Sequence, residues 1–480
     1  MSLAIFVCLL FGTATGRYHT RTVFPEIIEE RSEHGSLVLQ IHDGLALTLT
    51  KVSVATEALR LRSNWNGVFT DQTVNGTEIQ ASLFEDKVNM ATVSVEKASY
   101  GIKVTGVLNP TERIEPALFE RKGVPGRLPH LVHKIKQPLT MERITEEKLK
   151  EISPRKYSDM SMPDPVPIEV YIVSDESHNR RFADNDFLVY LCIFMNTIKA
   201  IFKNLIGPSV KIVLVGAEKS NKIQESEYIF GSDKLMNDLT SLHMFEKYVM
   251  NNLKQYGYPD VVLLLTGRDV YESTHGGIKK NIAGIAYEGG VCTERRVALS
   301  EDTPGAFSGI IDAAHELGHS LGASHDGTEP NRLTPGHPGS LNCSAKSGRL
   351  MTYVDGGHLR YRFSDCNEKE IRYVLKERGE KCWKINASKT YAIGGVFPGA
   401  ILKAADYCKR LYKSNQVYVS ASYNLKTNCK LKCCARLKSG GHACGVHPML
   451  DHMQCDYKKK CFQGLCTSEK ELITHRYKKE

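Results

Sequence analysis

Apolar and polar positions alternate along the first third of the chain with the period of two that predicts β-strands. Ser36–Ile41 and Val93–Glu96 are clear examples, and glycines mark the turns between such runs. The proline-rich stretch Met162–Pro167 comes next. We therefore expect a separate β-rich module over residues 17–160. In an exported hydrolase such a module is most simply a propeptide, and the alternative is an accessory binding domain.

Downstream of this link the apolar pattern alternates between strand-like and helix-like periods. Strands alternating with helices indicate an α/β fold, and runs of Val, Ile and Leu predict strands that are covered on both faces. The expected strands are Ile168–Val173, Val210–Val215 and Asp260–Leu265, and the expected helices are Asp186–Leu205, Ser241–Tyr256, Phe307–Gly322 and a last one that Ser364 caps and that ends near Arg378. Gly284–Tyr287 is predicted as an edge strand, along which a peptide can add as a further strand.

The cysteines divide the chain and indicate its compartment. Twelve of the 14 cysteines fall from Cys292 onward, which predicts six disulfides, while Cys192 lies in the apolar helix as a free core thiol. Eight of them crowd into the stretch from about residue 396, so we expect a small disulfide-rich module over 396–480. Sequence alone does not assign its pairing.

The N-terminus predicts export. An apolar run, Leu3–Phe11, is followed by small residues up to Gly16, as in a signal peptide spanning 1–16, and it is too short to cross a membrane. A second apolar stretch, Phe187–Phe202, is interrupted by Asn196 and Lys199 and predicts a buried helix instead. We expect an extracellular protein without a membrane span. Its N-glycosylation sequons are Asn75, Asn342 and Asn386.

Charge is concentrated at the C-terminus. The formal net charge is +9, and residues 401–480 hold 16 Lys and Arg against 6 Asp and Glu. A basic module of this kind attracts sulfated glycans or cell surfaces, and the alternative is a merely solvated basic face. Nucleic acid is not an expected partner of an exported protein.

The stretch His315–Asp326 carries the candidate chemistry, in the form H-E-x-x-H-x-x-G-x-x-H-D. On a helix, His315 and His319 lie four residues apart on one face, so both imidazoles can reach one metal ion. Glu316 beside them can reach a water at that ion. The alternatives are ordinary helix contacts for these residues, or a zinc site without activity.

Gly322 is predicted to end this helix, because glycine takes the positive φ that turns the chain sharply. The turn would return His325 as a third nitrogen ligand. Three histidines leave a fourth zinc position open, which indicates a catalytic site. A water there would have its pKa lowered toward ~7 and would lose its proton to Glu316, the expected general base, as it attacks a peptide carbonyl.

Three further segments accompany this motif, namely Leu350–Tyr353, the Phe363-Ser-x-Cys366 segment and the cysteine-rich stretch from Val396–Gly399 through Cys455 to Cys466. With them the chain resembles the reprolysin (adamalysin) branch of the metzincin metalloendopeptidases. The resemblance implies a zinc-protease domain over 166–390, with a twisted mixed sheet, long helices and a Met-turn, and a disintegrin-like module after it. The combination is most similar to the secreted metalloproteases of tick salivary glands.

The resemblance also implies roles for single residues. Met351, which by spacing alone could be ordinary core packing, would form the Met-turn beneath the zinc, and Asp326 would order the floor of the site. The implied disulfides are Cys292–Cys382 and Cys343–Cys366, and an implied structural calcium site comprises Glu169, Asp260 and Asn386. The family's propeptide cysteine is missing here, so latency would need a steric block or another ligand, for which His130 and His133 are candidates.

Two functions of different classes are therefore expected. The first is a secreted zinc endopeptidase that cleaves extracellular host proteins, such as matrix proteins or fibrinogen. The second is a non-catalytic binding protein that acts through the basic cysteine-rich tail.

Overall fold

The computed structural model describes most of the chain, with gaps at both ends and between the parts. The described residues are 20–31, 36–42, 45–65, 68–87, 89–99, 101–117, 127–136, 162–203, 205, 209–280, 282–332, 334–384, 403–411, 416–420, 423–436, 441–449, 453–462 and 465–468.

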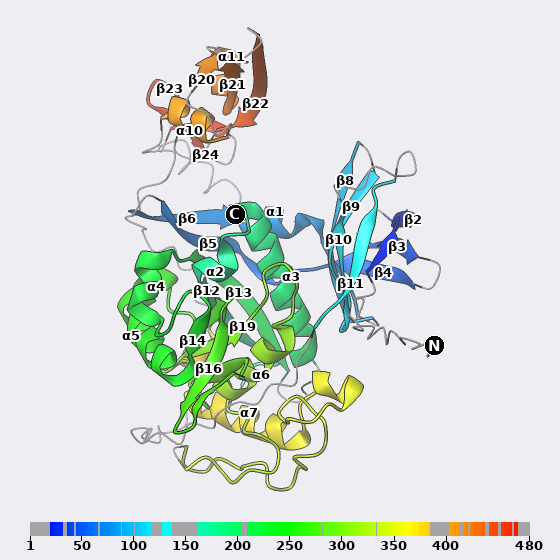
Figure 1. The fold of residues 1–480 in the computed structure, drawn as a ribbon, viewed down its shortest axis with the longest axis vertical. Coiled ribbons are helices and arrows are strands. Elements are labelled where there is room, and N and C mark those ends of the chain that lie inside the picture. The colour runs from blue at the N-terminus through cyan, green and yellow to red at the C-terminus, as the bar shows by residue number, and fades with distance from the viewer. Residues whose placement is uncertain are drawn as a thin grey trace, which may run out of the picture.

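A seven-stranded sheet lies at the centre of the protein (Figure 1). Its strands in spatial order are β18 (Gly284–Ala286), β19 (Val297–Glu301), β15 (Val261–Thr266), β12 (Val166–Ser174), β13 (Val210–Lys219), β5 (Ala55–Trp65) and β6 (Val68–Asn75). Neighbours are parallel except at the two ends, where β18 runs antiparallel to β19 and β6 antiparallel to β5.

The period of two along β12 assigns its side chains to two cores. Val170 and Ile172 pack in one core with the helices α3 and α6, whereas Tyr171 and Val173 pack in the other with α5. Both faces are covered, which is why the strands are apolar throughout. The helices of this domain are α2 (Glu176–Asn179), α3 (Asp184–Phe202), α4 (Lys222–Tyr228), α5 (Asp238–Tyr256), α6 (Ile310–Ser320), η3 (Gly357–Tyr361), α7 (Asp365–Arg378) and α8 (Glu380–Trp383).

The predicted mixed α/β fold is confirmed, with small shifts at the element ends. The zinc-motif helix is shorter than expected, because it begins at Ile310 rather than Phe307. Ser364 caps α7 as predicted, and its side chain accepts a hydrogen bond from the Asn367 amide. A small ribbon that the sequence did not indicate comprises β14 (Leu235–Asn237), β16 (Asp269–Thr274) and β17 (Gly277–Lys279).

Among the described residues, α3 is the one helix long and apolar enough to cross a bilayer. Most of it is buried in the protein core, where Phe187, Phe194 and Phe202 are fully enclosed. The helix therefore has the buried environment that its interrupted apolar pattern predicts.

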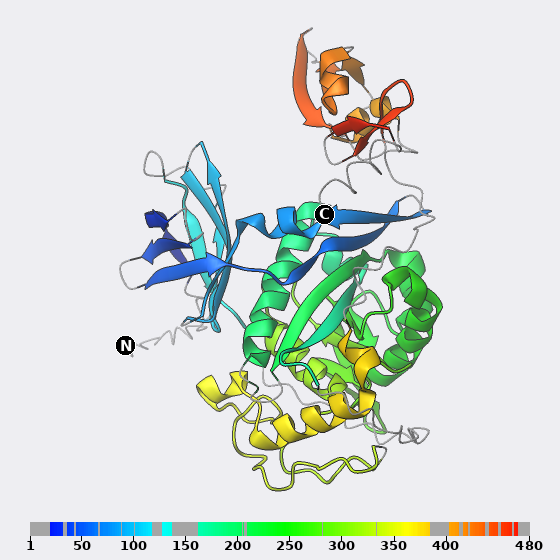
Figure 2. The ribbon, with the colours of Figure 1, turned by 180° about the vertical axis from the view of Figure 1, so that it is seen from behind.

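The N-terminal module is an antiparallel sheet of nine strands. Its strands in spatial order are β1 (Arg21–Val23), β11 (His130–Lys134), β10 (Glu112–Pro116), β9 (Gly101–Asn109), β8 (Ala91–Ala98), β7 (Leu83–Asp86), β4 (Leu45–Lys51), β3 (Ser36–His42) and β2 (Glu26–Arg31). Figure 2 shows it as a layer beside the central sheet. Its own core gathers Leu39, Leu47, Val93 and their neighbours.

This module does not pack separately from the protease part of the chain, so the expectation of a separate module was wrong. Between β4 and β7 the chain leaves the nine-stranded sheet, forms the hairpin β5–β6 in the central sheet, and returns through α1 (Gly76–Ile79) and η2 (Gln80–Ser82). Leu59 and Leu61 of the hairpin lie in the same core as α3 and α6. The reason is physical: one face of β5 is apolar, and burying it in this core removes its leucines from water.

Four disulfides hold the C-terminal module together. They are Cys408–Cys433, Cys429–Cys461, Cys434–Cys444 and Cys455–Cys466, and the first two lie in a core of cysteines, Leu431, Met449 and Met453. The described elements are α10 (Ala404–Leu411), β20 (Val417–Ser420), α11 (Tyr423–Thr427), β21 (Lys430–Arg436), β22 (His442–Pro448), β23 (Gln454–Asp456), β24 (Lys459–Phe462) and β25 (Leu465–Thr467). Such a small unit depends on its covalent links.

Cys192 is the free cysteine of the described residues, and it is fully buried in α3. Burial raises the pKa of its thiol to about 12, so it stays protonated and unreactive. We expect Ellman's reagent to find no thiol in the folded, exported protein and one per chain after denaturation. A thiol that reacts in the folded protein would contradict the packing of α3.

Candidate metal centre

Three imidazoles converge where α6 ends. His315 and His319 project from successive turns of the helix, and His325 lies beyond the turn at Gly322, whose φ is +105°. The Nε2 atoms of His315 and His319 are 3.1 Å apart, and those of His315 and His325 are also 3.1 Å apart. The third pair, His319 and His325, is separated by 3.3 Å. The structure thus brings together the three histidines of the motif.

The other nitrogen of each ring determines which tautomer is present. His315 Nδ1 lies 2.8 Å from the Leu350 carbonyl, and His319 Nδ1 lies 2.7 Å from the Ala323 carbonyl. Because a carbonyl oxygen only accepts, each Nδ1 carries the proton and each Nε2 presents a lone pair. The Tyr353 hydroxyl lies 3.3 Å from Nδ1 of His325.

These distances fit a tetrahedral zinc ion. Nitrogen ligands lie ~2.0–2.1 Å from zinc, which places two tetrahedral ligand atoms about 3.3 Å apart. Within the described part of the chain, the group consists of these three residues, which leaves the fourth position of a tetrahedral ion to water or substrate. Neutral imidazole is also a preferred zinc ligand. The donor set therefore suits a catalytic zinc ion.

Glu316, on the same helix as His315 and His319, lies against the edge strand β18. Its side chain is 2% exposed, and a Cβ added to Gly284 of β18 would lie 2.6 Å from Glu316 Oε1. Gly284 thus leaves the space that the carboxylate occupies. The sequence indicated an edge strand here but not this role for its glycine.

Met351 lies directly beneath the histidine-bearing helix. It is fully buried, and its carbonyl accepts a hydrogen bond from the Asp326 amide at 3.0 Å. A Cβ on Gly318 would lie 3.0 Å from Met351 Sδ and 2.9 Å from the Phe363 ring. Gly318 was missed in the sequence, although a lone glycine inside a helix, which costs about 1 kcal/mol, signals such a close approach.

Comparisons with known proteins agree with this geometry. The model of the reprolysin (M12B) family of zinc metalloproteases matches residues 167–386. Residues 167–386 are a reprolysin zinc metalloprotease domain. The mixed sheet and the enzyme class implied by the sequence motifs are thereby confirmed.

Several curated relatives are similar over more of the chain. A venom metalloproteinase, antarease-like, of Tityus trivittatus is 26% identical over 330 residues, which is 65% of this chain and 82% of that protein. Venom metalloproteinase BumaMPs1 of Olivierus martensii is 24% identical over 78% of this chain and 94% of its own length. A Bombyx mori protein named "A disintegrin and metalloproteinase with thrombospondin motifs like" is 26% identical over 64% of this chain, and the match spans 45% of that protein.

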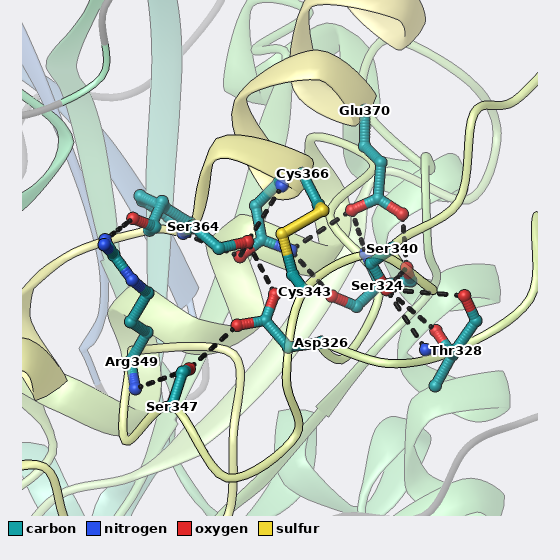
Figure 3. Close-up of a disulfide and its surroundings, with 12 residues drawn as sticks. Ser324, Asp326, Thr328, Ser340, Cys343, Ser347, Arg349, Ser364, Cys366 and Glu370 are labelled. Carbon is teal, nitrogen blue, oxygen red and sulfur yellow. Dashed lines mark hydrogen bonds between the residues drawn. A yellow bond between two sulfur atoms is a disulfide. The ribbon is translucent and has the colours of Figure 1, made fainter.

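In this reprolysin domain Asp326 joins the zinc loop to α7 (Figure 3). Its carboxylate accepts hydrogen bonds from Ser364 Oγ at 2.5 Å and from Ser347 Oγ at 3.1 Å. Burial raises the pKa of Asp326, and these two hydroxyls oppose the rise. Cys343–Cys366 bridges the same two segments. Asp326, which follows the third histidine, is therefore fixed by Ser364 at the start of α7 and by Ser347 of the preceding loop.

Glu370 of α7 holds the loop from the other side, and the sequence did not reveal it. Its carboxylate accepts hydrogen bonds from the Ser324 amide at 3.1 Å, from the Ser324 hydroxyl, and from Asn367 Nδ2 at 3.1 Å. Burial raises the pKa of Glu370 to about 7, and the bonds from Ser324 and Asn367 oppose the rise. Ser324 precedes His325, so α7 positions the third ligand through it.

The implied calcium residues are only partly brought together. Asp260 Oδ2 accepts a hydrogen bond from the Glu169 amide at 2.8 Å, and both side chains are buried. Burial raises the pKa of Asp260 well above its usual range, and the Glu169 carboxylate adds to the rise. Glu169 and Asp260 are thus neighbours in the fold. Asn386 lies outside the described residues.

The remaining implied residues lie in three parts of the protein. Cys292 pairs with Cys382, beside Asp260. Asn342 is exposed, whereas the side chain of Asn75 is half-buried and caps α1. His130 accepts from the Val104 amide and His133 contacts Glu115, so both candidates for a latency ligand are engaged inside the N-terminal sheet and neither serves the zinc.

Gly322→Ala should weaken zinc binding at least tenfold. A Cβ there would lie 2.3 Å from Val374 Cγ2, and φ of +105° strains any other residue, so the turn that returns His325 must shift. Zinc affinity by chelator competition checks this, with Gly276→Ala as the control, because a Cβ on Gly276 meets nothing closer than 4.0 Å. Unchanged affinity in Gly322→Ala would show that the turn tolerates a side chain.

Glu370→Gln should flatten part of the pH dependence of stability. The folded pKa of about 7 lies above the ~4.3 of an unfolded glutamate, so the native state binds more protons between these values. Stability due to Glu370 is therefore fully present below pH ~4.3 and is lost as pH rises through about 7.

The free energy of unfolding of the parent relative to Glu370→Gln should thus fall by ~1–3 kcal/mol from pH 4.5 to 8. Urea unfolding of the zinc-free proteins measures it. Glu377→Gln, in a half-buried position of the same helix, is the control. His337 and Glu288 also face Glu370, but they are common to both proteins. Parallel curves for parent and Glu370→Gln would refute the assignment.

Proposed function

We propose that this protein is a secreted zinc metalloendopeptidase that hydrolyses peptide bonds in extracellular proteins. The observation that carries the proposal is the position of Glu316, a buried carboxylate that follows His315 on the histidine-bearing helix and lies against Gly284 of the edge strand. A binding scaffold has no need of a carboxylate there. Fibrinogen and matrix proteins are the proposed substrates.

The substrate would bind along β18. This strand pairs with β19 on one side and is the last strand of the described sheet on the other. Its outer amides and carbonyls can therefore pair with an extended peptide. Because Gly284 of β18 touches Glu316, a peptide added here has its scissile bond beside the carboxylate. Strand addition also explains why an endopeptidase tolerates varied side chains.

Each residue of the site then has one task. Zinc, when bound, polarises the peptide carbonyl and makes water acidic enough to lose a proton near neutral pH. His315, His319 and His325 hold the ion with neutral nitrogens, so its positive charge is not offset. Glu316 takes the proton from the attacking water at one carboxylate oxygen and delivers it to the leaving nitrogen. The low exposure of Glu316 keeps bulk water from competing for that proton.

A second constellation of serine, histidine and aspartate does not support a different hydrolase. Ser174 Oγ lies 2.7 Å from His178 Nδ1, and His178 Nε2 lies 2.9 Å from Asp302 Oδ2. All three side chains are buried, so no substrate reaches the hydroxyl. Asp302 instead accepts a hydrogen bond from the Gly309 amide at 2.9 Å, directly before α6. The group supports the start of the zinc helix.

Two further parts of the proposal concern the surroundings of the site. Calcium would bind at Glu169 and Asp260, where it would neutralise two buried carboxylates and stabilise the end of the domain near Cys292–Cys382. The C-terminal module would bring the enzyme to sulfated glycans or cell surfaces. Its exposed cations among the described residues include Lys403, Lys426, Lys430, Arg436, Lys458 and Lys460.

Glu316→Gln should lower kcat/KM for a protein substrate by at least a hundredfold while zinc stays bound. The amide keeps the shape of the side chain but cannot take the proton. Gelatin or fibrinogen cleavage measures the activity, and metal analysis measures the zinc. Glu329→Gln, at an exposed position four residues past His325, is the matched control and should be fully active. A chelator should abolish the activity of both parent and control.

Two outcomes would contradict the proposal. Cleavage that survives in Glu316→Gln would show that Glu316 is not the general base. A protein that carries no zinc would show that the three histidines do not form a zinc site. If instead the parent cleaves no protein and binds heparin as tightly as Glu316→Gln does, with binding lost on deletion of residues 404–480, the non-catalytic binding protein is the better account.

A further inference from the structure

The hairpin β5–β6 completes the central sheet at the edge farthest from the substrate strand. In the sheet order β18 is the first strand, whereas β13 would be the last strand of the reprolysin domain without the hairpin. β5 runs parallel to β13, with Arg60 opposite Gly216 and Arg62 opposite Glu218. Figures 1 and 2 show the two blue strands lying along β13. Without them β13 would expose a row of unpaired backbone groups.

A buried ion pair joins the hairpin to the protease domain. Glu218 is fully buried, and Arg62, which is 8% exposed, places its Nε 3.6 Å from Glu218 Oε2. The hydroxyls of Tyr248 and Tyr256 donate to the same carboxylate at 2.6 and 2.7 Å. Burial raises the pKa of Glu218, and Arg62 is the charge that most opposes this. Removing the hairpin would take the counter-charge away from a buried carboxylate.

The protease domain is also shaped to receive Arg60. A Cβ on Gly216 would lie 2.9 Å from Arg60 Cβ, and one on Gly257 would lie 1.9 Å from Arg60 Nη1. Arg60 Nη1 donates to the Gln255 carbonyl at 3.3 Å. Gly257 also ends α5 with φ of +83°. A Cβ on Gly216 would also lie 2.5 Å from Tyr171 Cε2 of β12, so the missing side chain of Gly216 makes room for Tyr171 and for the hairpin together.

The two polar residues that interrupt the apolar helix α3 serve the same contact. Asn196 is 1% exposed, and its Nδ2 donates to Thr92 Oγ1 of β8 at 3.1 Å. Lys199 Nζ donates to the Ser53 carbonyl at 2.9 Å. Both partners belong to the N-terminal module. A buried polar group such as Asn196 is costly on a core helix unless it is paired, and Lys199 is only partly buried, so these two residues suit the face of α3 that meets this module.

We propose that residues 20–136 are a permanent, strand-donating part of the working protease, held by β5–β6 on the β13 edge. A cut within residues 137–161, for example after the dibasic pair Arg155-Lys156, then gives two chains that stay together, rather than a mature enzyme and a released propeptide. Removal would expose the leucines of β5, the edge of β13 and the carboxylate of Glu218 together. Because the hairpin lies at the edge opposite β18, its retention leaves the substrate strand open.

The experiment uses the full chain with the recognition sequence of a site-specific protease placed at residues 155–156. After cutting, gel filtration under native conditions should show both fragments co-eluting, and the cut protein should cleave protein substrate within twofold of the uncut protein. Hydrogen exchange at the amides of residues 214–219 should be unchanged by the cut, because β5 still covers them. This readout needs no variant and does not depend on activity.

Arg62→Glu tests the ion pair. It places a second negative charge beside Glu218, so the fragments of the cut variant should separate with at least a tenfold higher dissociation constant. Arg21→Glu is the matched control, since Arg21 is half-exposed, lies 3.8 Å from Glu112 and belongs to the same module. It should leave the fragments together.

Separate elution of the two fragments of the cut parent, with the larger one folded and active, would overturn the proposal. So would rapid exchange at residues 214–219 after the cut. If Arg62→Glu fails to fold, the cut parent alone decides, through its elution and its hydrogen exchange.

Discussion

Three imidazole nitrogens whose lone pairs converge within 3.3 Å repel one another until a cation lies between them. The protein must therefore hold them in place from outside. Two carbonyl groups do this directly, because Leu350 and Ala323 each fix a protonated Nδ1. The Met351 turn supports one, and the loop anchored by α7 supports the other.

Much of this centre can be predicted from the sequence because it is local. The helix, the four-residue spacing and the glycine turn involve twelve consecutive residues, and their geometry is that of any helix followed by a left-handed turn. Glu370 could not be found in this way. It lies 46 residues after Ser324, and α7 shows only an ordinary amphipathic pattern, so nothing local distinguishes its buried carboxylate from a solvated one.

The same limit explains why the sequence predicts a separate N-terminal module. Leu59 and Leu61 alternate with Arg60 and Arg62, a pattern typical of a strand with one face in water. The strand instead has a core on its apolar side and a tyrosine-lined carboxylate on its basic side. Parallel pairing of β5 with β13 joins residues about 150 positions apart, and no turn signal marks it. A charged side chain on a strand usually indicates an exposed face, but Arg62 of β5 is buried and balances the charge of Glu218.

The two edges of the reprolysin sheet, at β18 and at β13, differ in how they are covered. At β18, the last strand of the described sheet, a glycine lets the carboxylate of Glu316 approach the strand. At β13 the backbone is covered, and a glycine lets an arginine from the same chain approach. An unpaired strand edge promotes aggregation. A protein that keeps one edge of its sheet open for a peptide therefore gains from covering the other edge. The hairpin covers β13 with part of the same chain, so this edge is filled when the protein folds, whereas β18 stays the last strand of the described sheet.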